Sequence, residues 1–134
     1  MTAHRIRLRG PWELQWVGND AVPSHRVRLP AEWLEVVGNQ VGVIRLTRRF
    51  HKPSHMGPGE RADLVFQHWP GRWAVTLNAR AVETIEDCGG PEHRAVTDLL
   101  EPSNVLTLER RIEPGSASMP ASSFGEVSLE IRSD

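Results

Sequence analysis

The sequence predicts an all-β protein, an antiparallel β-sandwich of about eight strands. In nearly every apolar run the apolar side chains occupy alternate positions, which is the period of a half-buried strand. Turn-forming residues, 11 glycines and 10 prolines, lie mostly between these runs. No stretch longer than one turn keeps the spacing of an amphipathic helix. One polar and one apolar face on each strand is the pattern expected when two sheets pack together.

The first half of the chain contains four of the expected strands. A Gly10–Pro11 break between the first two indicates a bent or bulged strand. A short helical turn is expected over residues 31–35, directly after Pro30. The alternating apolar residues are Ile6 and Leu8; Trp12, Leu14 and Trp16; Val27 and Leu29; and Ile44, Leu46 and Phe50.

The second half contains four more strands of the same kind, and irregular loops are expected over residues 36–42, 53–60 and 114–123. Residues 1–134 are long enough for one domain with its own core, so a single domain is expected. The alternating apolar residues are Ala62, Leu64 and Phe66; Trp73, Val75 and Leu77; Leu106, Leu108 and Ile112; and Val127, Leu129 and Ile131. The expected core consists of Trp12, Leu14, Trp16, Ile44, Leu46, Phe66, Trp73, Val75, Leu77, Leu106, Leu108 and Val127.

Composition and charge argue against several classes of protein. The net charge of −1 lacks the basic excess of a nucleic-acid binder. No run of about 18 apolar residues is present, so no membrane partner is expected. The N-terminal residues have no apolar signal core, so a cytoplasmic location is expected, and the single cysteine, Cys88, excludes an internal disulfide. Residues 1–55 carry nine Lys/Arg and four Asp/Glu, whereas residues 56–134 carry seven and thirteen, which predicts ion pairs between strands of the two halves.

Residues 94–109 form the most informative stretch, a strand, a tight corner and a second strand. The short side chains of Thr97 and Asp98 can bond nearby backbone amides and turn the chain. Residues 99–100 then anchor the corner in the core, and residues 102–104 make the next turn. This block resembles the "V-T-x-L-L-x-x-G-x-N-x-L" corner in the N-terminal jelly-roll domain of β-galactosidases and β-glucuronidases.

The resemblance extends over nearly the whole chain in the family's order. Residues 8–14 are similar to its "L-x-G-x-W-x-F", residues 27–33 to "V-P-x-x-W", and residues 42–53 to "G-x-x-x-Y-R-R-x-F-x-x-P". Residues 73–78 look like "A-x-V-W-L-N-G", and residues 124–131 look like the closing "G-I-x-x-x-V-x-L". The resemblance implies a galactose-binding-like jelly-roll sandwich.

The sequence also departs from the family pattern. Asn78-Ala79 stands where the family has asparagine and glycine, so the tight glycine turn is expected to be absent or reshaped. Leu46 or Thr47 stands where the family has tyrosine. The family's catalytic glutamates belong to a barrel domain, and no motif of this sequence matches them. The resemblance therefore implies a domain without the catalytic barrel, without enzyme activity and without a cofactor.

Tryptophan suggests sugar binding, because the apolar face of a pyranose stacks on an aromatic ring. Trp12, Trp16 and Trp73 lie on apolar strand faces and are expected in the core, and Trp33 is expected to anchor its loop. Trp69 is the exception, since it lies in a turn between two strands, where burial is hardest to arrange.

One interpretation makes Trp69 a sugar platform, with His68 and Arg72 as hydrogen-bond donors and Asn78 as a further contact. The alternative is that Trp69 closes one end of the sandwich. An exposed Trp69 favours the platform, whereas burial under the loop of residues 114–123 favours a structural role.

Two other groups of residues invite a chemical interpretation, a pair of histidines and a cysteine among acidic residues, and in each the pattern argues against it. His51 and His55 are separated by Pro53, so they cannot share a helical face as zinc ligands and are expected to be loop histidines. The family resemblance leaves a structural calcium ion open, although no oxygen-rich loop specifies one.

Cys88 lies in an expected acidic loop whose carboxylates disfavour a thiolate. His93 is the one base close to it in sequence. An inert or mildly oxidisable thiol is therefore expected. The acidic residues are Glu83, Glu86, Asp87 and Glu92.

Two functions from different classes remain open. The first is a non-catalytic carbohydrate-binding module whose ligand residues are His68, Trp69, Arg72 and Asn78. The second is a structural or protein–protein interaction module that associates with itself or with a partner through an outer sheet face.

Overall fold

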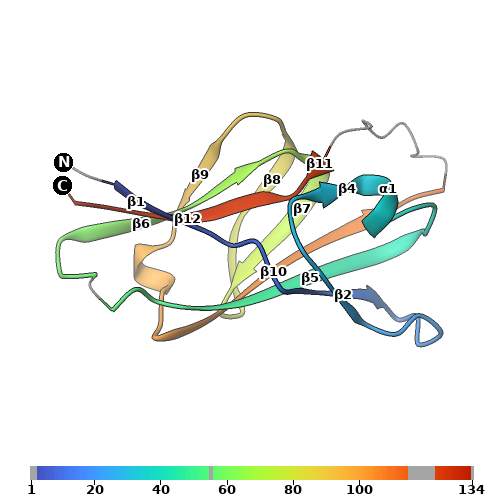
Figure 1. Ribbon diagram of the computed structural model, residues 1–134, viewed down its shortest axis with the longest axis horizontal. Coiled ribbons are helices and arrows are strands. Elements are labelled where there is room, and N and C mark those ends of the chain that lie inside the picture. Colours follow the sequence, from blue (N-terminus) through green and yellow to red (C-terminus); the bar gives the residue numbers. More distant parts are fainter. Residues whose placement is uncertain (1–2, 55, 115–122, 134) are drawn as a thin grey trace.

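The computed structural model of the chain describes residues 3–54, 56–114 and 123–133. Within these ranges the chain forms a jelly-roll β-sandwich whose strand pairs are antiparallel (Figure 1), which confirms the expected fold class. One sheet has the order β1 (Ala3–Arg7), β12 (Glu126–Ser133), β6 (Glu60–Gln67) and β9 (Glu92–Ala95). The other has the order β3 (His25–Val27), β2 (Trp12–Val17), β5 (Gly42–His51), β10 (Ser103–Ile112), β7 (Trp69–Leu77) and β8 (Arg80–Cys88). A short ribbon pairs β11 (Ser123–Phe124) with β4 (Ala31–Glu32), which leads into the helical turn α1 (Trp33–Val36).

All eight alternating runs of the sequence form strands, and the described residues contain four strands more. Two of these, β4 and β11, have only two residues each. The other two, β8 and β9, are edge strands, and most of their side chains are exposed. The acidic segment around Cys88 was expected to be a loop, and this expectation is wrong, because Glu83, Glu86 and Asp87 lie on β8. The buried and half-buried residues of β8, Val82, Ile85 and Cys88, are three positions apart, and register shifts interrupt its pairing with β7, so the period-two signal is weak there.

The core lies between the two sheets and contains all twelve residues expected in it, none of them more than 7% exposed. Trp33 is also buried, at the start of α1, where its ring packs against Phe124 at 4.9 Å between ring centroids. It therefore anchors its segment, as expected. The helix and its ribbon close one end of the sandwich (Figure 1).

The break at Gly10–Pro11 marks a change of sheet, where a bent strand was expected. β1 pairs with β12 in the four-stranded sheet, whereas β2 pairs with β3 and β5 in the six-stranded sheet. The corner after β9 is tied down differently from the expectation as well. Thr97 accepts a hydrogen bond at its Oγ1 from the backbone amide of Ala62 at 2.9 Å, on β6, and not from a neighbouring amide.

Ion pairs join strands from the two halves of the chain, as the charge distribution predicts. Arg45 on β5 pairs with Glu109 on β10 at 3.1 Å, and Arg5 on β1 pairs with Glu130 on β12 at 2.9 Å. None of the described helices is long and apolar enough to cross a membrane.

Candidate functional site

Trp69 lies in the core and has no exposed surface. Its ring meets Trp73 edge-on at 5.0 Å and Phe124 at 5.8 Å, and its Nε1 donates a hydrogen bond to the carbonyl of Glu126 at 2.8 Å. Of the two interpretations of Trp69, its burial contradicts the exposed sugar platform and supports the structural role. The preceding residue, His68, has a φ of 58°, and this left-handed turn begins β7 with Trp69 on the inner face. Residues 115–122 of the loop expected to cover Trp69 lie outside the described residues.

Asn78 is a structural residue of the corner, and its side-chain bonding capacity is used within the protein. Its Nδ2 donates to the Leu99 carbonyl and to Oδ1 of Asn104, each at 2.9 Å. Its Oδ1 accepts from the Val105 amide at 2.8 Å. Because Asn78 and Ala79 have φ values of 55° and 66°, a tight two-residue turn is present without glycine, contrary to the expectation. A role for the Asn78 amide in ligand binding is therefore not supported.

Arg72 and His68 are both exposed, but Arg72 lies on a strand and His68 lies in a connection between two strands. Arg72 lies on the outer face of the six-stranded sheet, in a shallow groove with Glu109 and Arg111. His68 lies between β6 and β7, and its Nε2 is 3.8 Å from a carboxylate oxygen of Glu126. The four residues expected to form one sugar site are therefore not brought together.

The outer face of the four-stranded sheet carries the polar residues that do converge. Cα partners on neighbouring antiparallel strands share a face, so the pairings Arg7 with Ser128 and Ser128 with Val65 place these three side chains in one row. Ser128 and Val65 are nearly buried although they face outward, and Val65 does not belong to the core cluster between the sheets. They form the floor of a depression on this face.

This depression is a groove of about 300 Å³, which is at the lower end of the range for small-ligand sites. We call it the arginine groove. Leu29 and Pro30 supply an apolar wall, and Gln67 and Glu126 close one end. Four arginines line it, from β1, from the segment after β1 and from the segment before Pro30. They are Arg5, Arg7, Arg9 and Arg28.

Three of the four arginines have no side-chain hydrogen bond or ion pair among the described residues. Arg7, Arg9 and Arg28 are exposed, and none of their guanidinium groups forms a hydrogen bond or ion pair with residues 3–54, 56–114 or 123–133. A backbone hydrogen bond from Leu29 to the Arg9 carbonyl, 2.8 Å long, holds the two segments that carry Arg9 and Arg28 together. The groove therefore concentrates uncompensated positive charge in a protein whose net charge is −1.

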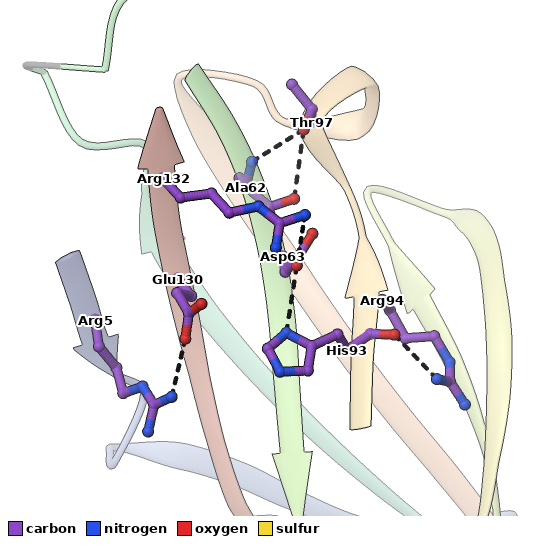
Figure 2. A network of polar contacts seen from close by, with 8 residues as sticks. All are labelled: Arg5, Ala62, Asp63, His93, Arg94, Thr97, Glu130 and Arg132. Carbon is purple, nitrogen blue, oxygen red and sulfur yellow. Dashed lines mark hydrogen bonds and ion pairs between the residues drawn. The ribbon is translucent and has the colours of Figure 1, made fainter. Parts of the chain in front are cut away.

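Farther along the same face, the charges are paired. Figure 2 shows Arg5 reaching across to Glu130, and Arg132 and His93 on either side of Asp63. The Asp63 carboxylate oxygen is 3.4 Å from Arg132 Nη2 and 3.3 Å from His93 Nδ1. The hydrogen bond from Arg5 lowers the pKa of Glu130 below its ordinary value, against a smaller opposing effect of burial. This part of the face is internally neutralised, whereas the arginine groove has bonding capacity to offer.

The arginine groove was not predicted from the sequence, although the alternation of arginines that contributes to it is visible there. Arg5, Arg7 and Arg9 alternate with Ile6 and Leu8, which places the three arginines on one face of an expected strand. Nothing in this alternation tells which arginine finds a carboxylate. Arg28 reaches the groove because the chain folds back beside Arg9, where the Leu29 amide donates to the Arg9 carbonyl.

The remaining chemically reactive residue is Cys88, a buried free cysteine at the end of β8. Burial is the largest cause that raises the pKa of its thiol to about 11, with a further contribution from Glu92. Its Sγ lies 3.2 Å from the carbonyls of Phe66 and Gly90. Such a thiol is a poor nucleophile at neutral pH. No group of three or more His, Cys, Asp or Glu side chains that could hold a metal ion occurs in the described part of the chain, and His55 lies outside it.

Comparisons with known proteins place this fold. No model of a known protein family matches the sequence, and no curated protein matches it. Among solved structures, an FMN-binding β-glucuronidase from Faecalibacterium prausnitzii L2-6 superposes with a TM-score of 0.77 at 24% identity, over 96% of this chain and 22% of that one. A β-glucuronidase from Dictyoglomus thermophilum gives a TM-score of 0.77 at 12% identity, over 99% and 28%. A provisionally assigned β-galactosidase from Bacteroides fragilis gives 0.72 at 12% identity, over 99% and 24%.

These likenesses concern the fold. The chain spans between 22% and 31% of the length of the glycosidase chains that it resembles. The described residues contain a sandwich and no barrel. The resemblance read from the sequence is therefore confirmed: this chain has the jelly-roll fold found in one part of β-glucuronidase and β-galactosidase chains.

Proposed function

We propose that the protein is a non-catalytic carbohydrate-binding module, and that it holds its saccharide in the arginine groove. The observation that carries the proposal is the groove itself, where polar side chains of three kinds surround a floor of Ser128 and Val65. The likeness to part of glycosidase chains adds support, because such chains act on saccharides. The site differs from the one expected around Trp69.

The groove suits a saccharide in its chemistry. Guanidinium groups donate to sugar hydroxyls, the Gln67 amide both donates and accepts, and the Glu126 carboxylate accepts. The exposed Pro30, beside the almost fully buried Leu29, offers apolar contact to the C–H face of a sugar ring. Glycoside hydrolysis generally requires two carboxyl groups flanking the bond, and Glu126 is the one carboxylate among the described groove residues. This composition favours binding without cleavage.

The test is isothermal titration calorimetry against a panel of neutral and charged oligosaccharides. We expect saturable binding to one class, weakened at least about tenfold in Gln67→Ala, since two hydrogen bonds to the ligand are lost. Arg26→Ala is the matched control, because Arg26 is exposed on β3 and lies outside the groove, and it should bind like the wild type. A folded protein that binds no saccharide of the panel contradicts the proposal.

A second candidate is an interaction module for another protein or a second copy of the chain. Burial of Trp69 favours it, and so does the exposure of two large apolar side chains, Leu34 at 71% and Val41 at 46%. Sedimentation velocity distinguishes the two candidates. A dimer that dissociates in Leu34→Ser or Val41→Ser would favour the interaction module, whereas a monomer with a saccharide ligand would exclude self-association as its function.

A further inference from the structure

We infer that the saccharide bound in the arginine groove carries an oxyanion substituent, which Arg7, Arg9 and Arg28 bind together. The saccharide part of this inference rests on the proposed function. The oxyanion part rests on the charges of the groove. A carboxylate, a sulfate ester and a phosphate ester share the relevant chemistry, since each presents acceptor oxygens to the planar guanidinium fork.

The first argument is the contrast between these arginines and others of the chain. Arg5, Arg45 and Arg132 each reach a carboxylate within 3.4 Å, and Arg94 reaches Glu92 at 3.0 Å. Arg110 donates to the Pro70 carbonyl at 2.7 Å and lies over the Trp33 ring. Seven arginines lack an acceptor within the described residues. Four of them, Arg26, Arg49, Arg72 and Arg80, lie outside the groove, whereas Arg7, Arg9 and Arg28 are gathered in its lining.

The second argument is charge balance within the groove. The lining contains four arginines and one carboxylate, Glu126. Arg5 is already paired with Glu130, and Glu126 faces His68 at 3.8 Å on its outer side. The uncompensated charge therefore belongs to Arg7, Arg9 and Arg28. Like charges held close together repel one another, so an anion between them is bound favourably.

The third argument is the shape of the floor. Ser128 and Val65 are small, and they leave space beneath the arginine side chains that a larger residue would fill. Ser128 offers a hydroxyl that can donate to an oxyanion. An oxyanion seated on this floor has donors from β1, from the segment after it and from the segment before Pro30.

The experiment compares one oligosaccharide backbone in four forms: unsubstituted, carboxylated, sulfated and phosphorylated. Binding is measured by calorimetry for the wild type and for the triple variant Arg7→Gln, Arg9→Gln, Arg28→Gln. The matched control is Arg26→Gln, Arg49→Gln, Arg80→Gln. It removes the same charge from exposed arginines outside the groove. Sodium sulfate, sodium phosphate and sodium acetate alone are titrated as well.

We expect at least one charged form to bind tenfold or more tightly than the unsubstituted form. The groove triple variant should lose that preference, and the control triple should keep it within twofold. Which charged form binds tightest identifies the oxyanion. Because all six arginines are exposed, both variants should fold, which far-ultraviolet circular dichroism checks; if the groove triple does not fold, the single variant Arg28→Gln replaces it.

Several outcomes separate this inference from the proposed function. Equal binding of charged and unsubstituted forms, lost in Gln67→Ala, overturns the inference and leaves the proposed function standing. An inorganic anion that binds through the three arginines, with no saccharide bound, overturns the proposed function and supports the oxyanion site. Equal losses in the two triple variants show attraction by overall charge and overturn the inference. No binding of any probe overturns both.

Discussion

The segment from His68 to Asn78 and the arginine groove carry similar kinds of side chain, yet they differ in whether those side chains have bonding capacity left. In the first region, Trp69 is enclosed by the aromatic core and Asn78 bonds to Leu99, Asn104 and Val105. In the second, three guanidinium groups have no protein partner among the described residues. The first region therefore holds the sandwich together, and the second is available to a ligand.

The difference concerns how residue types are interpreted. Tryptophan and asparagine are common in sugar sites because a ring stacks and an amide both donates and accepts. The same properties make them good core and corner residues. A residue type indicates a site only when its donors, acceptors and surface are not used within the fold. The predictions below test this difference between the two regions, from the largest expected effect to the smallest.

The largest effect is expected for Trp69→Ala. Removing a fully buried aromatic side chain costs about 3–5 kcal/mol of unfolding free energy. The change also leaves the Glu126 carbonyl without its indole donor. Urea denaturation followed by circular dichroism measures the loss. Trp69→Phe, which retains much of the packing, should lose less. A stable Trp69→Ala protein would return this residue to the list of candidate ligand contacts.

Asn78→Ala should have the next largest effect, a loss of about 2–3 kcal/mol. The substitution leaves the Val105 amide without its Asn78 acceptor and removes one of the two hydrogen bonds that Asn104 Oδ1 accepts, at a corner that is largely closed to water. Thermal and chemical denaturation measure it. Asn39→Ala is the control, since Asn39 is exposed, and its change should stay within about 0.5 kcal/mol. Equal effects from the two variants would contradict a structural role for Asn78.

Glu130→Gln tests the paired part of the outer face and should cost up to about 1 kcal/mol at pH 7. Since Arg5 lowers the folded-state pKa of Glu130, the pair stabilises the fold when the carboxylate is ionised. This contribution is present above the unfolded glutamate pKa of about 4.3 and is lost as the pH falls through the lower folded value. The difference between wild type and variant should therefore vanish toward pH 2. Urea denaturation at several pH values measures it, and a difference that persists at the lowest pH would contradict the assignment to this pair.

The smallest effect on stability is expected for the groove triple variant Arg7→Gln, Arg9→Gln, Arg28→Gln. No hydrogen bond or ion pair between these guanidinium groups and the described residues is lost, and repulsion between like charges decreases. The unfolding free energy should stay within about 0.5 kcal/mol of wild type or rise slightly. Denaturant midpoints measured at low and high salt test this. A loss above 1 kcal/mol would mean that the arginines support the fold, as Trp69 and Asn78 do in the segment from His68 to Asn78.

Local pattern determined much of the fold by itself. Period-two alternation identifies eight of the strands in the described residues and the twelve residues expected in the core, because a side chain that alternates toward the core must be apolar whatever its partner strand. Edge strand β8 gave no such signal, since its buried and half-buried residues, Val82, Ile85 and Cys88, recur at every third position. The family resemblance rests on turn and strand motifs that occur in the family's order, and it led to the correct β-sandwich fold.

The site depended on tertiary structure. Whether Trp69 in a turn faces water or the core depends on the left-handed conformation at His68 and on Phe124, which lies 55 residues away in sequence. Whether Arg5 or Arg7 is free depends on Glu130 and Ser128, which the pairing of β1 with β12 places opposite them. The sequence by itself determined which side chains face outward on the eight strands whose apolar residues alternate. Only the folded chain determined which of them remain unpaired. Hydrogen bonds and ion pairs act over short distances, and here they join strands that are distant in sequence, so the partners meet only in the folded protein.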